Sequence, residues 1–321
     1  MSVTPPTAEP PAARDRLHAT QDNLGPDGGM QGVQPVDSPV GDFWARDPVA
    51  ADEIRRQVRA DYTLVVQAGG SSGCCGPSPS CCGEAPTVSI QTLSSLRLGY
   101  SQAELDLMPE GANLGLGCDN PGAIAALQSG EVVADLGAGA GIDAFLAARA
   151  VGPTGRVIGV DMTPEMVSKA RANAESGEYA NVDFRLGEIE HLPVADATVD
   201  VIISNCVINL SPDKAAVFRD AYRVLKPGGR LAISDVVASA ELPDDVAGDM
   251  ALYSGCMAGA SLIADLHDMM AAAGFEDIRI APKDESKDFI EQWAPGRSIT
   301  DYVVSATIEA VKPASSTSTC C

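Results

Sequence analysis

The chain has 321 residues, of which 45% are hydrophobic and 21% are charged. That length allows about two domains, or one large domain with appendages, around a packed core. The formal net charge of −22 repels phosphate backbones and anionic lipids, which argues against nucleic acid and membrane surfaces as partners. No run approaches the ~18 apolar residues of a spanning helix, and the N-terminus lacks the order of a signal peptide, so we expect a soluble, cytoplasmic protein.

The first 125 residues contain little that predicts a core. Residues 1–40 are rich in Pro, Gly, Asp and Gln, and we expect a disordered arm there. Residues 47–66 alternate apolar and charged positions as an amphipathic helix does. The Gly- and Pro-rich stretch 69–83 excludes helix and strand interiors, so residues 41–125 are expected to form an N-terminal helix followed by a flexible, cysteine-rich loop.

From Gly130 onward, short apolar runs alternate with helical segments, which is typical of βαβ units. The predicted strands cover residues 132–136, 157–160, 182–186, 199–204 and 230–237. Two helices are expected to start at Thr163-Pro164 and Ser211-Pro212, where a capping residue precedes proline. A later helix is expected at 262–273 and a late strand at 302–311. The prediction is an α/β fold with a parallel sheet over 126–238, a further region over 239–312, and a mobile tail over 313–321.

Nine cysteines are present, including three adjacent pairs, Cys74-Cys75, Cys81-Cys82 and Cys320-Cys321. Neighbouring cysteines bridge each other only through a strained ring, and an odd count in a long chain fits a secreted disulfide framework badly. We therefore expect reduced thiols with a chemical role, although a lone Cys118, Cys206 or Cys256 is equally well explained as a small buried apolar residue.

A glycine-rich loop, Asp135-Leu136-Gly137-Ala138-Gly139-Ala140-Gly141, follows the first predicted strand and opens a helix. Glycines there let the backbone approach a ligand closely, at the sheet edge where open α/β sheets bind nucleosides. The second strand ends in Asp161, near the offset at which an acid binds ribose hydroxyls. Asp135 would repel a pyrophosphate but suits the cationic groups of S-adenosylmethionine, so a NAD-dependent oxidoreductase is the less favoured alternative.

These motifs resemble those of the class I, Rossmann-like methyltransferases. The matching segments are Asp135 to Gly141, Val160-Asp161, Gly187-Glu188-Ile189, Asp200 to Asn205, and Leu225-Lys226-Pro227-Gly228-Gly229. The resemblance implies helices on both faces of the sheet and an S-adenosylmethionine site. Its expected residues are Asp135, Gly137, Gly139, Gly141, Asp161, Met162, Glu188, Ile189 and Asn205.

Three isolated cysteines occupy segments that such a fold brings to the carboxyl edge of the sheet: Cys118, Cys206 and Cys256. Converging thiolates favour a soft centre. Zinc fits less well, because Cys-x-x-Cys pairs are missing and the three histidines are far apart in sequence. Trivalent arsenic fits better, since three sulfurs leave it a lone pair able to attack a sulfonium methyl group.

The segments around these cysteines resemble the bacterial arsenite S-adenosylmethionine methyltransferases. They are Gly117-Cys118, Ser204 to Lys214, and Gly255-Cys256 with the following Gly259-Ala260. The resemblance implies that Cys206 and Cys256 hold trivalent arsenic, and that Cys118 and an upstream cysteine form the reducing disulfide. Cys75 and Cys82 are our candidates, although Cys74 and Cys81 stay open.

The resemblance further implies that arsenite and methylated trivalent arsenicals are the substrates, and that thioredoxin or glutathione resets the enzyme. We expect a monomer that serves arsenic detoxification. Two alternatives stay open: a class I methyltransferase of another small metabolite, and a non-enzymatic thiol protein that sequesters metalloid. The sequence does not fix the number of methyl groups added, the acceptance of antimonite, or the role of Cys320 and Cys321.

Overall fold

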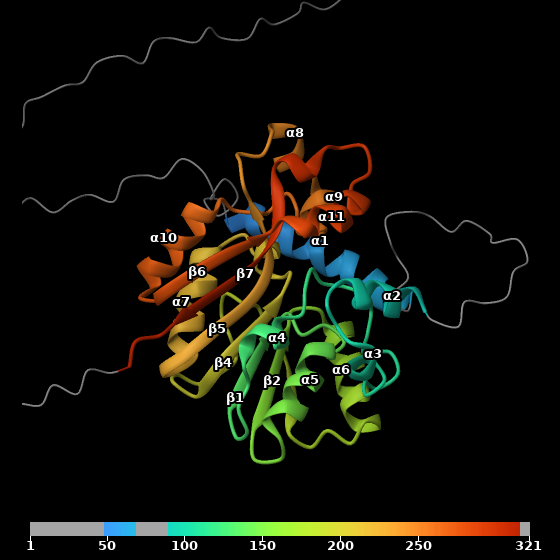
Figure 1. Cartoon of the computed structure of the whole chain (residues 1–321), viewed down its shortest axis with the longest axis vertical. Helices are drawn as coiled ribbons and strands as arrows, with labels where there is room; N and C mark the ends of the chain where they lie inside the picture. Colours follow the sequence, from blue (N-terminus) through green and yellow to red (C-terminus); the bar gives the residue numbers. More distant parts are fainter. Residues whose placement is uncertain (1–47, 69–88, 315–321) are drawn as a thin grey trace, which may run out of the picture. The chain divides into compact units, whose positions relative to one another are not determined.

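A computed structural model describes residues 48–68 and 89–314 (Figure 1). The predictions for residues 1–40, for the cysteine-rich stretch 69–83 and for the tail after residue 314 lie outside the described residues. Within the described part, no helix has the length and apolar character needed to cross a membrane.

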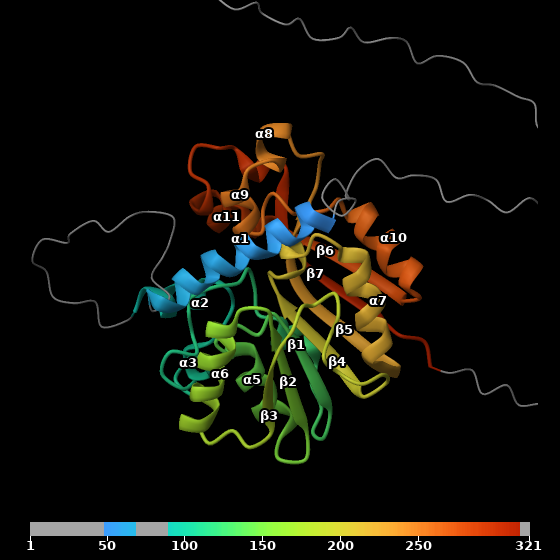
Figure 2. The same cartoon turned by 180° about the vertical axis from the view of Figure 1, so that it is seen from behind.

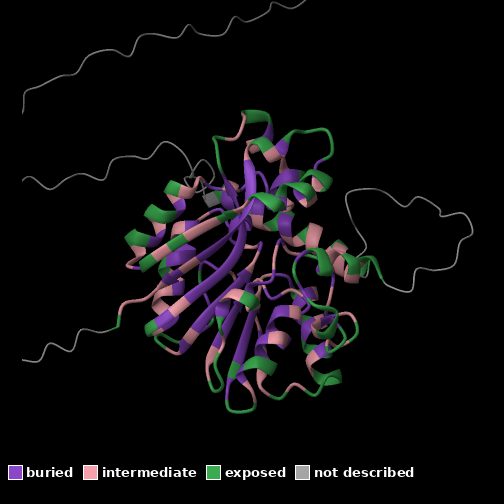
Figure 3. Cartoon of the chain, in the orientation of Figure 1, coloured by how far each residue is buried: buried purple, intermediate pink, exposed green. Residues whose placement is uncertain are grey.

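A seven-stranded sheet with the strand order β3-β2-β1-β4-β5-β7-β6 forms the centre of the fold. Strands β1 to β5 are parallel to one another, whereas β7 runs antiparallel to both β5 and β6. The strands are β1 (Val132–Leu136), β2 (Arg156–Asp161), β3 (Val182–Leu186), β4 (Val199–Asn205), β5 (Leu225–Ala238), β6 (Glu276–Lys283) and β7 (Val303–Val311). Figure 3 shows that the central strands are buried along most of their length.

Helices precede, connect and follow these strands. The α-helices are α1 (Pro48–Gln67), α2 (Ile90–Arg97), α3 (Gln102–Leu105), α4 (Pro121–Ala125), α5 (Ile142–Val151), α6 (Pro164–Ser176), α7 (Lys214–Val224), α8 (Asp244–Ala247), α9 (Met250–Ser254), α10 (Ile263–Ala273) and α11 (Lys287–Trp293). Three short 3-10 helices are η1 (Ile208–Leu210), η2 (Asp284–Ser286) and η3 (Ile299–Asp301).

Alternate residues of the central strands face opposite sides of the sheet, so two apolar cores form. Ala134 and Leu136 of β1 belong to the core under α7 and α10. Val133 belongs to the core under α4, α5 and α6. The architecture is therefore α/β with helices on both faces, as the sequence predicts.

Strands β1 to β4 and the helices at 47–66 and 262–273 match their predicted positions within two residues, whereas β5 begins at Leu225, five residues before the predicted start, within the segment 225–229 that was expected to be a turn. The expected strand at 302–311 is β7. The expected helix start at Ser211-Pro212 is wrong, because α7 begins at Lys214 and the Asp213 carboxylate caps it by accepting from Ala216 N at 2.8 Å. Ser211 instead donates to Glu190 at 2.7 Å.

Helix α1 lies across the carboxyl end of the parallel strands, in contact with α6 and α9 (Figures 1 and 2). Its Arg55 pairs with the buried Glu190 at 2.9 Å, and its Thr63 donates to Glu165 of α6 at 3.0 Å. Asp61 accepts from the Ser254 hydroxyl of α9 at 2.6 Å. These three contacts hold α1 over the edge of the sheet at which the predicted site residues lie.

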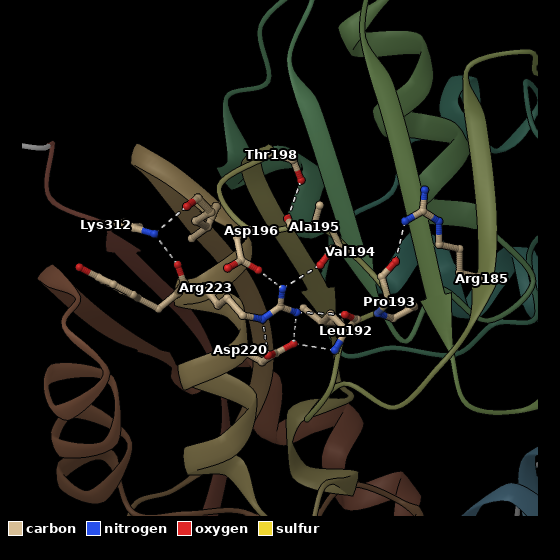
Figure 4. A network of polar contacts seen from close by, with 12 residues as sticks. Arg185, Leu192, Pro193, Val194, Ala195, Asp196, Thr198, Asp220, Arg223 and Lys312 are labelled. Carbon is tan, nitrogen blue, oxygen red and sulfur yellow. Dashed lines mark hydrogen bonds and ion pairs between the residues drawn. The ribbon is translucent and has the colours of Figure 1, made fainter.

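A second polar network fixes the connection between β3 and β4 (Figure 4). The Arg223 guanidinium of α7 donates to the carbonyls of Leu192 at 3.0 Å and Val194 at 2.8 Å. It also pairs with Asp220 at 2.8 Å and Asp196 at 2.6 Å. Because planar guanidinium groups hold several acceptors in fixed directions, this connection is anchored to α7.

Candidate active site

The glycine-rich loop turns sharply between β1 and α5. Gly137 and Gly141 have φ angles of +68° and +103°, which residues with a Cβ rarely adopt. A Cβ at Gly137 would overlap the Val207 side chain, and one at Gly141 would overlap the Phe145 ring. The loop is therefore packed against the residue that follows Cys206, so the predicted cofactor loop and the predicted thiol segment are direct neighbours.

Asp135, at the end of β1, is 2% exposed, and its Oδ2 has no hydrogen-bond partner. Burial and the nearby carboxylates of Asp143 and Asp161 raise its pKa well above the usual range. A buried carboxylate oxygen without a partner is costly unless a ligand supplies one. Since the neighbours are acids, a cationic group at this position would stabilise the ionised carboxylate, and the ammonium group of S-adenosylmethionine is such a group.

Asp161, at the end of β2, connects two backbone segments of the site. Its Oδ1 accepts from Thr163 N at 2.8 Å and its Oδ2 from Gly139 N at 3.0 Å. The Thr163 side chain also hydrogen-bonds to this carboxylate, so three of its four lone-pair positions are used and one is left for a ribose hydroxyl. Burial raises the pKa of Asp161, whereas the bonds from Thr163 and Gly139 lower it.

Other predicted cofactor residues have protein partners. Glu188 lies 3.6 Å from Arg55 and 3.5 Å from Arg59, both on α1. Ile189 is buried in the core under α7 and α10, and the half-buried Met162 packs against the cluster that contains the three cysteines. No sequence motif predicts that α1 supplies the partners of Glu188.

Asn205 is a predicted cofactor contact. In the structure its side chain links the segment around Cys118 to the end of β4 by hydrogen bonds. Its Oδ1 accepts from Cys118 N at 3.0 Å, and its Nδ2 donates to the Asp119 carbonyl at 2.8 Å and to Tyr100 Oη at 2.9 Å. Tyr100 in turn donates to Asp143 at 2.7 Å. Burial raises the pKa of Asp143 to about 6, although the bonds from Tyr100 and Asn205 lower it.

Cys118, Cys206 and Cys256 meet as three free, buried thiols. They come from the segment before α4, from the end of β4 and from the loop after α9, and they share one cluster with α1, β5, β7 and α11. The Cys206 thiol contacts those of both Cys118 and Cys256, so it is the central member. The Cys256 thiol also donates to the Cys206 carbonyl at 2.7 Å.

The surroundings keep the Cys206 and Cys118 thiols protonated at neutral pH. Hydrogen bonds with Cys118 and Cys256, together with burial, raise the pKa of Cys206 well above its usual value. Burial also raises the pKa of Cys118. A neutral reagent that takes up the thiol protons as it binds is therefore favoured over one that needs preformed thiolates.

Among residues 48–68 and 89–314, no group of three or more His, Cys, Asp or Glu side chains has the arrangement of a metal-ion site. The observed thiol contacts are pairwise through Cys206, so joint binding by all three sulfurs stays a prediction. The predicted catalytic residues Cys75 and Cys82 lie outside the described residues.

Tyr62 of α1 is a site residue that sequence reasoning missed, because it was read only as part of an apolar helix face. Its hydroxyl contacts the Cys256 thiol and lies 3.4 Å from the Ser254 carbonyl. Burial and the nearby Cys256, Cys206 and Asp161 raise its pKa well above the usual value. Tyr62 therefore lies between the thiol cluster and the predicted ribose acid.

The strand order with one antiparallel strand, the glycine loop after β1 and the acids ending β1 and β2 define a class I methyltransferase. A family model described as a methyltransferase domain matches residues 127–274. An arsenite methyltransferase of Halobacterium salinarum is 54% identical over 281 residues, which cover 84% of this chain and 68% of that protein. The chain therefore belongs to the arsenite methyltransferase family.

Two further relatives agree with this assignment. An arsenite methyltransferase of Aquipseudomonas alcaligenes is 48% identical over 162 residues, which cover about half of each protein, 48% of this chain and 47% of the relative. The crystal structure of CrArsM, an arsenic (III) S-adenosylmethionine methyltransferase from Chlamydomonas reinhardtii, is similar with a TM-score of 0.52 and 34% identity. That match covers 68% of this chain and 73% of the other.

Proposed function

We propose that this protein transfers a methyl group from S-adenosylmethionine to trivalent arsenic held by its buried thiols, as a step of arsenic detoxification. The observation that carries the proposal is the meeting of Cys118, Cys206 and Cys256 directly beside the glycine loop, where Val207 packs against Gly137. A methyltransferase of another metabolite has no need of three buried thiols there. A protein that only sequesters metalloid has no need of a buried Asp135 oxygen, Oδ2, without a hydrogen-bond partner.

Asp135 is proposed to bind the ammonium group of the methyl donor and Asp161 one of its ribose hydroxyls. When bound, S-adenosylmethionine supplies an electrophilic methyl group on a sulfonium sulfur. The protein itself is proposed to orient the arsenic acceptor toward the methyl group and to exclude water from the site. Holding two reactants in line contributes up to about 7–11 kcal/mol to the rate enhancement.

Arsenite is a neutral acid at pH 7, so the −22 charge of the chain does not repel it. In each exchange an As–S bond forms, an As–O bond breaks, and the thiol proton leaves with the hydroxyl as water. Protonated Cys206 and Cys118 are therefore suitable ligands. Arsenic keeps its lone pair for attack on the methyl carbon, so no general base is required.

After transfer, two thiolates are proposed to form a disulfide and return two electrons to arsenic. Cys118 and one upstream cysteine, Cys75 or Cys82, are the proposed pair, and thioredoxin or glutathione is the proposed reductant. We also propose a cytoplasmic monomer. Free, buried thiols suit a reducing compartment, and the described thiols and the glycine loop all come from one chain.

Product speciation tests the proposal. Protein, arsenite, S-adenosylmethionine and either glutathione or a thioredoxin system are incubated, and arsenicals are separated and quantified by mass spectrometry. Wild type is expected to form methylated arsenicals, and Cys206→Ser to form none while still binding S-adenosylmethionine by calorimetry. Absence of methylated product from wild type with either reductant would overturn the proposal, and an active serine variant would remove the chemistry from Cys206.

A further inference from the structure

The backbone at two of the three cysteines is left-handed. Cys206 has a φ angle of +58° and Cys256 one of +63°. A side chain with a Cβ is disfavoured in this region, and such a conformation persists only where the surrounding structure holds it. The contacts that hold these two residues therefore determine whether their thiols face each other.

One bond between the two segments uses a reacting group. The Cys256 thiol donates to the Cys206 carbonyl at 2.7 Å. Because arsenic takes the place of the thiol proton, this hydrogen bond is lost as soon as Cys256 binds the substrate. A bond that keeps the two segments together during the reaction must come from a group other than the thiols.

Asn209 supplies such a bond. It lies in η1, directly after the Cys206 turn, and is 1% exposed. Its Nδ2 lies 2.6 Å from the Val236 carbonyl, 2.9 Å from Asp235 Oδ1 and 3.1 Å from the Cys256 carbonyl, and its two N–H groups are shared among these three acceptors. The amide therefore joins the Cys206 turn, β5 and the Cys256 loop.

Asp235 fixes the orientation of this amide. It is 1% exposed, and it accepts from Ile208 N at 2.8 Å and from Val236 N at 2.7 Å as well as from Asn209. The Val236 and Cys256 carbonyls can only accept, and Asp235 Oδ1 already accepts from Val236 N, so the end of Asn209 turned toward them must be the NH2 group. This rules out the flipped amide, which would place an acceptor oxygen against Asp235 and the two carbonyls.

We propose that Asn209, oriented by Asp235, is the positioning residue that keeps Cys206 and Cys256 face to face while arsenic is bound. This inference deepens the proposed function and rests on it. A preformed pair of sulfurs binds arsenic without the cost of ordering two loops. Without the Asn209 amide, the Cys256 loop relaxes from its left-handed conformation when the thiol bond to Cys206 is exchanged, and the affinity for arsenic falls.

The test uses a reagent that bridges two thiols and needs no turnover. The six cysteines outside the described residues also bind arsenicals, so the full-length background replaces them all: Cys74→Ser, Cys75→Ser, Cys81→Ser, Cys82→Ser, Cys320→Ser and Cys321→Ser. Phenylarsine oxide and arsenite are titrated, and binding is followed by the near-ultraviolet absorption of the As–S bonds. Iodoacetamide, which reacts with single thiols, reports thiol accessibility.

Asn209→Ala removes the amide, and Asn209→Ser keeps a single donor that satisfies Asp235 but leaves the Cys256 carbonyl without one. Asn181→Ala is the matched control, because Asn181 Nδ2 also donates to two backbone carbonyls, those of Ala148 and Gly152, both at 3.0 Å. Both Asn209 variants are expected to bind phenylarsine oxide at least tenfold more weakly than the background. Their S-adenosylmethionine affinity is expected to stay within twofold, and the control to match the background.

Unchanged phenylarsine oxide affinity in both Asn209 variants would overturn the proposal. Equal losses of phenylarsine oxide and S-adenosylmethionine affinity, together with a lower melting temperature, would also overturn it, because Asn209 would then be merely structural. The proposed function fails separately, when a wild-type chain that binds phenylarsine oxide forms no methylated arsenical.

Discussion

Because Asp135 Oδ2 is buried without a hydrogen-bond partner, we expect one substitution of Asp135 to have opposite effects on folding and on binding. Asp135→Asn removes an ionisable carboxyl group. In the native protein, burial raises the pKa of that group well above its usual value. The native protein therefore holds this proton more tightly than the unfolded chain, and stability decreases as pH rises from about 4 toward the native pKa. At pH 8 the unfolded wild type is ionised at this position, so folding must either bury the charge or take up a proton, and both cost free energy that the variant does not incur.

A buried, unsatisfied polar group costs about 1–3 kcal/mol, and more when it is charged. The variant without ligand is therefore expected to be more stable at pH 8 by roughly that amount, and a domain of this size gains about 2–4 °C in melting temperature per kcal/mol. At pH 5 the difference is expected to shrink. Loss of one partner of a buried ion pair costs about 2–5 kcal/mol, so S-adenosylmethionine affinity should fall by a factor of roughly 30 to 4,000.

Thermal unfolding at both pH values and calorimetric titration with S-adenosylmethionine measure the two effects. Asp183→Asn is the matched control, because Asp183 forms ion pairs with Arg156 and Arg185 at the surface of β3. Surface pairs contribute about 0–1 kcal/mol, so the control should lose little stability and no affinity. An Asp135→Asn protein that binds S-adenosylmethionine as tightly as wild type, or that is less stable at pH 8, would refute the reasoning.

Three further perturbations address other contacts of the site. Asp161→Ala is expected to weaken S-adenosylmethionine binding at least tenfold by calorimetry with arsenite binding intact; unchanged cofactor affinity would disprove the ribose assignment. Tyr62→Phe removes only the hydroxyl beside Cys256, so the KM for arsenite should rise several-fold in steady-state assays, and an unaltered KM would contradict that contact. Burial raises the pKa of Asp143 to about 6 and of Asp235 to about 7, so urea unfolding should show lower stability at pH 8 than at pH 5; a higher stability at pH 8 would contradict this sign.

Strand β4 was predictable because it is buried on both faces. Val199 to Asn205 reads as a near-continuous apolar run because helices cover both sides of β4. Strand β6 was missed because it forms the edge of the sheet and carries the exposed Glu276, Asp277 and Arg279. Its register also shifts between Glu276 and Arg279, where Asp277 has a φ angle of +51°. Neither feature produces a regular alternation of apolar and polar residues along the sequence.

Site residues at strand ends were predictable, because topology alone brings the ends of parallel strands to one edge. Asp135, Asp161 and Cys206 are of this kind. The role of Asn205 was not predictable, since its partners Tyr100 and Asp119 come from segments whose path depends on tertiary packing. The same holds for Glu188, whose partners Arg55 and Arg59 reach it only because α1 crosses the sheet edge.

The left-handed backbone at Cys206 and Cys256 illustrates why local sequence does not encode a binding geometry. Cysteine has no preference for this conformation, which costs about 1–2 kcal/mol per residue. That cost is incurred when the chain folds, before arsenic arrives, and is offset by buried hydrogen bonds such as the one from Cys206 N to the Ser234 carbonyl at 2.7 Å. Because the substrate does not have to supply this free energy, the strain lowers the stability of the fold without lowering the affinity of the thiol pair.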